Sequence, residues 1–176
     1  ASAIAALSHP NIIQVYDVGY AGPVCYIASA YCEGASLAEE LLTRRQRFAP
    51  RQAAHLVMQL ASAAHYVHRS GLLHRDLKPS NVLLWPATET TEGMLFIPKL
   101  TDFGLAKFVE QSLEDTRSSV LLGTPLYMAP EQAECRHEDV GPWTDVYALG
   151  AILYELLSGA PPFAGQGLLL VLNRVR

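Results

Sequence analysis

The sequence predicts an α+β fold in which short strands come first and helices follow. Two runs near the N-terminus, 11–19 and 24–32, are rich in residues that favour strands, and a turn-forming stretch separates them. The later run 144–159 is almost wholly apolar and predicts a helix that is buried on all sides. A short strand–turn–strand element with polar residues at its mouth lies between them. We expect a cleft where the two parts meet.

Composition supports one folded domain. The chain has 176 residues, of which 50% are hydrophobic and 17% are charged, so it has enough apolar material for a core. The formal net charge is -4 and the basic residues are scattered, so we do not expect nucleic acid as the main partner. No apolar run approaches the roughly 20 residues of a membrane-spanning helix. We expect no membrane segment in this chain.

The cysteines favour a reducing compartment. Cys25, Cys32 and Cys135 are an odd number without metal-ligand spacing, and the six histidines are dispersed. We therefore expect a cytoplasmic location, and a membrane anchor outside this segment stays open.

The elements can be assigned in order along the chain. The first two strands form a hairpin across 20–23. Ser36 is placed to cap a helix. The apolar positions of that helix are Leu37, Leu41 and Leu42. Pro50 suits the first turn of a longer helix over about 50–70. Its apolar residues recur at helical spacing and are Ala53, Leu56, Val57, Leu60, Ala64 and Val67.

The second half alternates between short elements and a long loop. Two strands, 81–85 and 94–100, are joined by the polar stretch 86–93, which we interpret as surface decoration. Residues 102–142 are rich in Gly, Pro, Ser and Thr and predict irregular structure, which in a compact domain tends to be functional or disordered. After the helix at 144–159, a last helix begins near Gln166.

Polar residues crowd into HRDLKPSN, residues 74–81. Asp76, Lys78 and Asn81 fall within one short turn that Pro79 stiffens. Polar groups beside apolar surface are costly unless they pair with each other or with a ligand. A polar surface loop of accidental composition is the alternative.

A second acidic motif favours the ligand interpretation. Asp102 opens the motif DFG directly after a predicted strand, so hairpin pairing would bring it close to Asn81. Two oxygen ligands at one opening suit a hard cation such as Mg²⁺. Asp76 is then placed to accept a hydroxyl proton, and Lys78 is placed to neutralise a phosphoryl group in transfer. This set predicts phosphoryl transfer.

Taken in order, the motifs resemble those of a eukaryotic-like protein kinase domain, and they are most similar to bacterial serine/threonine kinases. HRDLKPSN resembles the catalytic loop, DFG the magnesium motif, and GTPLYMAPEQ (123–132) the end of the activation segment. DVYALG (145–150) resembles the start of the family's buried central helix, and HPNII (9–13) the start of its fourth strand.

The resemblance implies part of a two-lobe kinase fold. Residues 1–32 would be a remnant of the N-lobe with the hinge, and residues 33–176 would be a mainly helical C-lobe, incomplete at its end. The glycine-rich loop and the strand lysine are not found in the chain, and the family's helix glutamate would fall at or before Ala1. We expect a domain truncated at both ends, whose isolated segment is inactive.

The resemblance also implies site roles with ATP and Mg²⁺ as cofactors. Asp76 would be the catalytic base, and Asn81 and Asp102 the metal ligands. Lys78 followed by Pro79 is the form of the loop found in serine/threonine kinases. The positions implied for nucleotide binding are Ala30, Cys32, Leu83 and Asp102.

Further positions would be structural or regulatory. The implied structural residues are His74, Arg75, Phe103, Glu131 and Asp145. In this reading His74 stacks with Phe103, Asp145 holds the catalytic-loop backbone, and Glu131 pairs with a late arginine beyond Arg176. An arginine directly before Asp76 is typical of kinases whose activation loop is ordered by a phosphate, so autophosphorylation is a possible input. The implied activation-segment residues are Thr116, Ser118, Ser119 and Thr124.

The sequence leaves three functions open. The complete set of Asp76, Lys78, Asn81 and Asp102 favours an active kinase acting on protein serine or threonine hydroxyls. A non-catalytic kinase-like binding or scaffold module is the alternative, because the strand lysine is not in the chain. A small-molecule phosphotransferase of related fold ranks last, because GTPLYMAPEQ resembles a segment that cradles a peptide substrate.

Overall fold

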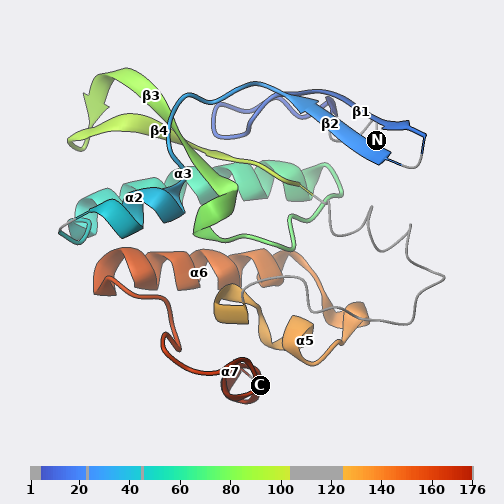
Figure 1. Ribbon diagram of the computed structural model, residues 1–176, viewed down its shortest axis with the longest axis vertical. Helices are drawn as coiled ribbons and strands as arrows, with labels where there is room; N and C mark the ends of the chain where they lie inside the picture. The colour runs from blue at the N-terminus through green and yellow to red at the C-terminus, as the bar shows by residue number, and fades with distance from the viewer. Residues whose placement is uncertain (1–4, 23, 45, 104–124, 176) are drawn as a thin grey trace.

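The computed structural model describes residues 5–22, 24–44, 46–103 and 125–175, and it places two small sheets against a helical body (Figure 1). The helices and strands are β1 (Val15–Ala21), β2 (Val24–Ser29), α2 (Leu37–Thr43), α3 (Pro50–Arg69), β3 (Val82–Thr91), β4 (Met94–Leu100), α5 (Pro130–Ala133), α6 (Pro142–Ser158) and α7 (Leu168–Val175). Short 3-10 turns add η1 (Pro79–Asn81), η2 (Pro125–Tyr127) and η3 (His137–Asp139). The predicted α+β class is confirmed.

The first hairpin forms where the sequence predicts it, with shorter strands. β1 and β2 pair antiparallel. β1 starts at Val15 rather than at residue 11 because the preceding residues bond to another strand. The amide of Ile13 donates to the Leu100 carbonyl at 2.9 Å, and the Leu100 amide donates to the Asn11 carbonyl at 2.9 Å. These bonds fasten the hairpin to the end of β4.

α2 begins with the predicted cap. The Glu39 amide donates to Ser36 Oγ at 3.2 Å, and the Ser36 amide donates to Glu39 Oε2 at 2.7 Å, which completes a capping box. Of its apolar positions, Leu37 is fully buried and Leu41 is half-buried, whereas Leu42 is 86% exposed. Adjacent residues of a helix lie about 100° apart around its axis, so Leu41 and Leu42 do not share one face.

Removing the cap of α2 should cost a modest amount of stability. We expect Ser36→Ala to lower the free energy of unfolding by about 1 kcal/mol, because one helix-end amide loses its acceptor. Urea denaturation of the full-length protein measures this. Ser36→Thr keeps the hydroxyl and should retain most of the stability, so equal losses in both variants would contradict the capping explanation.

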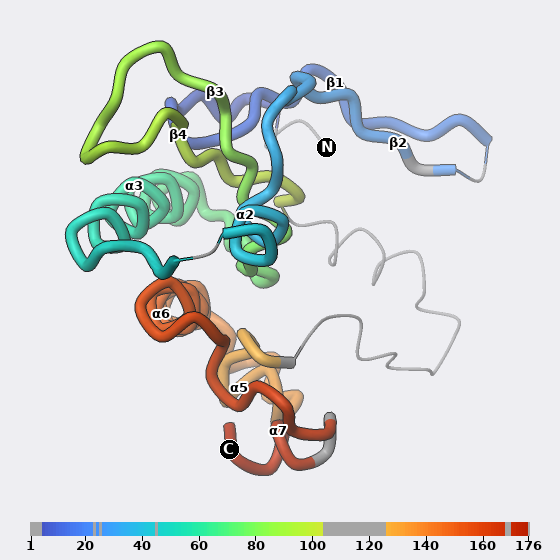
Figure 2. Tube along the Cα trace, turned by 60° about the vertical axis from the view of Figure 1, so that its left-hand side comes forward, coloured from blue at the N-terminus to red at the C-terminus, as the bar shows by residue number. Residues whose placement is uncertain are grey.

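The core lies between α3 and α6. The predicted apolar positions of α3 are buried or half-buried, which confirms its helical period. Leu56 and Leu60 of α3 belong to the same cluster of buried residues as Ile152 and Leu156 of α6. α6 lies between α3 on one side and α5 and α7 on the other (Figure 2). A smaller cluster around Val171 joins α5 to α7.

α6 is not buried on all sides, so that prediction was wrong. Its exposed apolar side chains are Trp143 (61%), Val146 (61%), Tyr154 (54%) and Leu157 (40%). Among the described elements, α3 and η2 make the main packing contacts with α6. An apolar composition shows that a helix has favourable surface to bury, but which faces are covered depends on its neighbours.

The second hairpin is longer than predicted. β3 continues through most of the expected linker 86–93, and the reversal comes at Glu92 and Gly93, which both have positive φ. The side-chain amide of Gln52 on α3 donates to the Glu92 carbonyl at 3.0 Å, and Arg51 pairs with the Glu92 carboxylate at 3.0 Å. These contacts hold the hairpin tip on the start of α3. Residues 86–93 therefore extend the hairpin and contact α3, which their polar composition did not indicate.

The later chain is also more regular than predicted. The described part of 102–142 contains α5 and the turns η2 and η3. No helix in the ranges that the structure describes is both long and apolar enough to cross a bilayer.

Candidate functional site

The candidate site is built on the turn between α3 and β3. This turn ends in η1, where Pro79 occupies the first helical position. Arg75 has φ of 66°, and Asp102, just after β4, has φ of 62°. Left-handed conformations cost free energy in residues other than glycine, and they persist where surrounding contacts fix them. The contacts that fix this turn also define the site.

The turn brings together Asp76, Lys78 and Asn81. Lys78 Nζ lies 2.7 Å from Asp76 Oδ2. Asn81 is buried, and its Nδ2 donates to the Asp76 carbonyl at 2.8 Å and to Asp76 Oδ2 at 3.0 Å. One carboxylate oxygen of Asp76 therefore accepts both bonds. Within the described part of the chain, Oδ1 of Asp76 accepts no hydrogen bond and is free to accept one from another group.

The β3–β4 hairpin brings the segment of Asp102 beside Asn81. Val82 pairs with Leu100, and the Thr101 amide donates to the Asn81 carbonyl at 3.0 Å. Asp102 follows directly and is exposed. The hairpin pairing expected from the sequence is thus confirmed.

The donor chemistry of Asn81 and Asp102 fits magnesium. Because Asn81 Nδ2 is committed to Asp76, the amide oxygen Oδ1 is its atom with ligand character. A carboxylate and an amide oxygen are hard ligands, and Mg²⁺ commonly takes only one or two from the protein. The described residues contain no group of three or more His, Cys, Asp and Glu side chains able to hold a metal. Asn81 with Asp102 is the candidate pair because the bond from the Thr101 amide to the Asn81 carbonyl holds their segments together.

Asp145 supports the turn from α6. Its side chain is 1% exposed, and its two oxygens accept from the backbone amides of His74 (3.0 Å) and Arg75 (2.9 Å). His68 Nε2 on α3 donates to Oδ2 at 2.7 Å. The carboxylate thus ties α3, α6 and the turn together.

His68 was missed as a site residue. The histidines of α3 were predicted to be ordinary helix residues, and nothing in local spacing connects His68 with Asp145, 77 positions away. Its place in the last turn of α3, just ahead of the polar turn, was the available signal.

His74 is buried beside Phe103. The ring centroids lie 4.7 Å apart, and His74 Nε2 donates to the Thr101 carbonyl at 2.9 Å. The Asp76 amide donates to Nδ1 of His74 at 3.4 Å, so the neutral ring satisfies both partners. Burial lowers the pKa of His74 below its usual 6.5, against the opposing effect of the Asp145 carboxylate.

This burial should make stability depend on pH. A histidine whose pKa is depressed in the folded state binds protons more readily when unfolded, so its contribution is complete above pH 6.5 and is lost as pH falls through the folded pKa. We expect the melting temperature of the full-length protein to fall from pH 7.5 to 5.5, and to fall less in His74→Phe. Equal pH dependence in both proteins would exclude His74 as the cause.

The segment before α6 reaches the turn through Gln132. Its Nε2 donates to the Arg75 carbonyl at 2.8 Å, and its Oε1 accepts from the Ala129 amide at 3.2 Å. Glu131 accepts from Thr144 Oγ1 at 2.5 Å, so within the described chain it anchors the start of α6. The Gln132 contact joins residues 57 positions apart and was not predicted from the sequence.

A second missed contact lies nearby. The Tyr127 hydroxyl donates to Glu155 Oε2 at 2.5 Å. Burial raises the pKa of Glu155, and burial together with the bond to Glu155 raises the pKa of Tyr127. This pair links η2 to α6.

Of the residues expected to contact a nucleotide, Ala30 and Cys32 lie in the linker from β2 to α2, and Leu83 lies on β3. The Ala30 amide donates to the Gln14 carbonyl at 2.8 Å. Cys32 is half-buried, and Leu83 forms an antiparallel bridge with Ser36. The predicted activation-segment residues, which are Thr116, Ser118, Ser119 and Thr124, lie outside the described residues.

Known proteins match the chain in sequence and in structure. A family model described as protein kinase domain matches residues 1–171. The serine/threonine-protein kinase PknB of Mycobacterium leprae is 39% identical over 166 residues, which cover 92% of this chain and 25% of PknB. The serine/threonine-protein kinase PkaA of Streptomyces coelicolor is 40% identical over 173 residues, which cover 98% of this chain and 30% of PkaA.

A solved structure agrees with these relatives. A crystal structure of a mutant PknI kinase domain from Mycobacterium tuberculosis superposes with a TM-score of 0.70 and 30% identity, over 92% of this chain and 55% of that one. The chain spans about a quarter of the length of the PknB relatives that it matches, at 25%.

Proposed function

The chain belongs to the protein kinase family, and on that premise we propose that the full-length protein transfers the terminal phosphoryl group of ATP to serine or threonine hydroxyls of proteins. The observation that carries the proposal is the cluster of Asp76, Lys78 and Asn81 beside Asp102. The family generally uses ATP with Mg²⁺. In the proposed division, residues 1–32 belong to the N-lobe and hinge and residues 33–176 to the C-lobe.

Asp76 would accept the proton of the substrate hydroxyl. Its Oδ2 is occupied by Lys78 and Asn81, which fix the carboxylate and leave Oδ1 as the acceptor. Lys78 would move its positive charge toward the transferred phosphoryl group while staying within reach of Asp76. Both residues act from a turn whose backbone Asp145 holds by two hydrogen bonds.

Asn81 and Asp102 would hold the magnesium ion. The ion supplies neutralisation of phosphate charge when it is bound. Leu83 would pack against the adenine, and the backbone of Ala30 and Cys32 would recognise its edge.

Regulation and location follow the same premise. Arg75 would pair with a phosphate on the activation segment, for which Thr116, Ser118 and Ser119 are the candidate acceptors, so we propose autophosphorylation as the activating step. The free thiol of Cys32 favours a reducing, cytoplasmic environment.

The test is phosphate transfer by the full-length protein. We expect radiolabel from ATP to appear on serine or threonine of the protein or of a generic protein substrate, only with Mg²⁺, and to be absent in Asp102→Ala. Label on a small molecule alone would favour the small-molecule phosphotransferase. Binding of ATP by a folded protein that transfers no label would favour the scaffold module.

A further inference from the structure

Gln132 joins α5 to the turn that carries Asp76. Its Nε2 donates to the Arg75 carbonyl at 2.8 Å, and its Oε1 accepts from the Ala129 amide at 3.2 Å. A carbonyl can only accept and a backbone amide can only donate, so the two partners together fix which end of the side-chain amide faces which. The contact therefore requires a side chain that carries a donor and an acceptor at its tip.

The acceptor of this bond belongs to the peptide group between Arg75 and Asp76. A peptide group is planar, so a bond to its carbonyl also fixes the nitrogen from which Asp76 begins. The other described bond to this group is longer, with the Asp76 amide 3.4 Å from His74 Nδ1. Arg75 has a φ of 66°, a conformation that surrounding contacts have to maintain. The Gln132 bond is thus the shorter of the two described bonds that hold this peptide group.

A second glutamine makes the same pair of contacts elsewhere in the fold. The tetrapeptides APRQ (49–52) and APEQ (129–132) begin the helices α3 and α5. Gln52 Oε1 accepts from the Ala49 amide at 3.2 Å, and Gln52 Nε2 donates to the Glu92 carbonyl at 3.0 Å. Each glutamine thus caps the start of its helix and binds a distant backbone carbonyl. The glutamine of APRQ binds the hairpin tip, whereas that of APEQ binds the peptide group before the proposed base.

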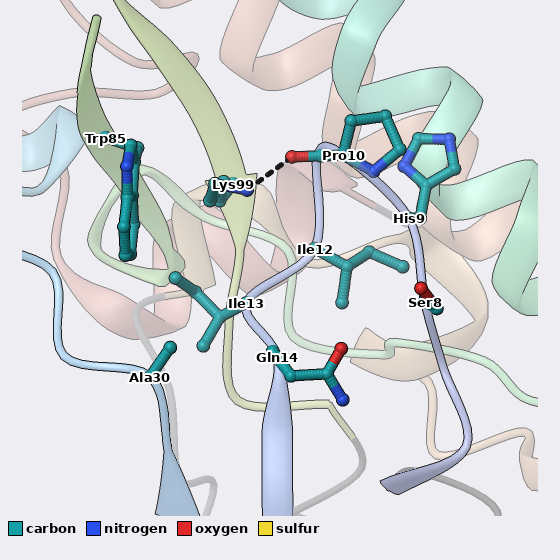
Figure 3. Close-up of a pocket in the computed structure, with 9 residues that line it drawn as sticks. All are labelled: Ser8, His9, Pro10, Ile12, Ile13, Gln14, Ala30, Trp85 and Lys99. Atoms are coloured by element: carbon teal, nitrogen blue, oxygen red, sulfur yellow. Dashed lines mark hydrogen bonds between the residues drawn. The ribbon is translucent and has the colours of Figure 1, made fainter.

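The proposed metal ligands are held by contacts that do not involve Gln132. Asn81 and Asp102 flank the β3–β4 hairpin. The N-terminal segment fastens this hairpin, because Lys99 Nζ on β4 donates to the Pro10 carbonyl at 2.6 Å (Figure 3). Breaking the Gln132 contact should therefore disturb the base and leave the segments of the metal ligands in place.

We propose that Gln132 is a positioning residue for Asp76, through which the end of the activation segment orients the catalytic base. The inference rests on the proposed function, in which Asp76 accepts the hydroxyl proton. Gln132 ends the motif GTPLYMAPEQ, which resembles the segment of a kinase that cradles the peptide substrate. One side-chain amide thus connects this segment with the base, so a displacement of the segment also releases the base.

Gln132→Glu tests this proposal in the full-length protein. Glutamate keeps the acceptor for the Ala129 amide but replaces the donor with a second oxygen, which repels the Arg75 carbonyl. We expect kcat for phosphate transfer to fall by about tenfold to a hundredfold, the cost of a small misplacement of a reacting group, while the KM for ATP stays within about twofold. Gln52→Glu makes the same change at the hairpin tip and should leave kcat unchanged. Thermal unfolding shows whether both variants are folded.

A double mutant shows whether Gln132 acts through Asp76. Gln132→Glu should lower the residual transfer of Asp76→Asn much less than it lowers that of the wild type, because the base has already been removed. An equal fold-loss in both backgrounds would overturn the proposal, as would wild-type kcat in folded Gln132→Glu or an equal loss in Gln52→Glu. If Gln132→Glu does not fold, Gln132→Met, which removes the donor without adding a charge, takes its place.

Failure of the proposed function gives a different result. In that case the wild type transfers no phosphate, or Asp76→Asn transfers it as fast as the wild type, and both proposals are contradicted. An active wild type that requires Asp76 but tolerates Gln132→Glu contradicts the positioning role alone.

Discussion

Replacing Asp76 with asparagine is expected to lower the rate of phosphate transfer by about 10²–10⁴-fold, the range attributed to a positioned general base. The asparagine side chain has nearly the same shape, but it cannot take up the hydroxyl proton. Its carbonyl oxygen can still accept from Lys78 and Asn81, which both donate to Asp76 Oδ2. The NH2 group then takes the place of Oδ1, the oxygen proposed to accept the hydroxyl proton. The loss should fall on kcat, because Asp76 is not among the residues expected to hold ATP.

Steady-state kinetics of the full-length protein with a protein substrate measure this effect. The matched control is Glu89→Gln, an equally conservative change at an exposed carboxylate on β3, and it should leave kcat unchanged. ATP binding should be similar in Asp76→Asn and in the wild type. A variant that retains more than about a tenth of the wild-type kcat would exclude Asp76 as the base.

Local spacing carried most of the site prediction. Asp76, Lys78 and Asn81 fall within six residues of chain, so any tight turn brings them close, and Pro79 restricts the turn further. The position of Asp102 close to Asn81 could be predicted with one additional assumption, which was that the two adjacent strands pair. They do pair. The helix boundaries followed from capping residues and from the spacing of apolar side chains, as at Ser36.

Long-range contacts were beyond that reasoning. His68 meets Asp145, and Gln132 meets the Arg75 carbonyl, only because helices distant in sequence pack around the turn. A polar side chain on a helix gives no local sign of a partner more than 50 positions away. The exposed apolar face of α6 has the same origin, because hydrophobic composition does not specify how many neighbours a helix has.

Two of these long-range partners converge on Arg75, and together they explain its unusual backbone. Its amide donates to Asp145 at 2.9 Å, and its carbonyl accepts from Gln132 at 2.8 Å. Both polar groups of a residue with φ of 66° are thereby held in place. The peptide that leads into Asp76 is fixed from α6 on one side and from α5 on the other. The orientation of the candidate base thus depends on residues outside the turn.

Asp145→Ala should be the most destabilising of the substitutions considered. It leaves the buried amide of His74, the partly buried amide of Arg75 and the ring of His68 without an acceptor, so we expect the free energy of unfolding to fall by about 3–5 kcal/mol. Asp145→Asn keeps one carbonyl oxygen as an acceptor but places an NH2 group against one of the donors. Its free energy of unfolding should therefore fall less than that of Asp145→Ala. Urea denaturation followed by tryptophan fluorescence measures both variants.

The same substitutions separate support of the fold from support of the site. If Asp145 orients the turn, Asp145→Asn should lower kcat strongly at a temperature where the variant is still folded. The reason is that the backbone around Arg75, which leads into Asp76, is then held less firmly. His68→Leu removes one donor to Asp145 and leaves both backbone bonds, so it should lower stability modestly and change kcat little. Loss of stability without loss of kcat in folded Asp145→Asn would show that the carboxylate holds α3 to α6 and does not position the base.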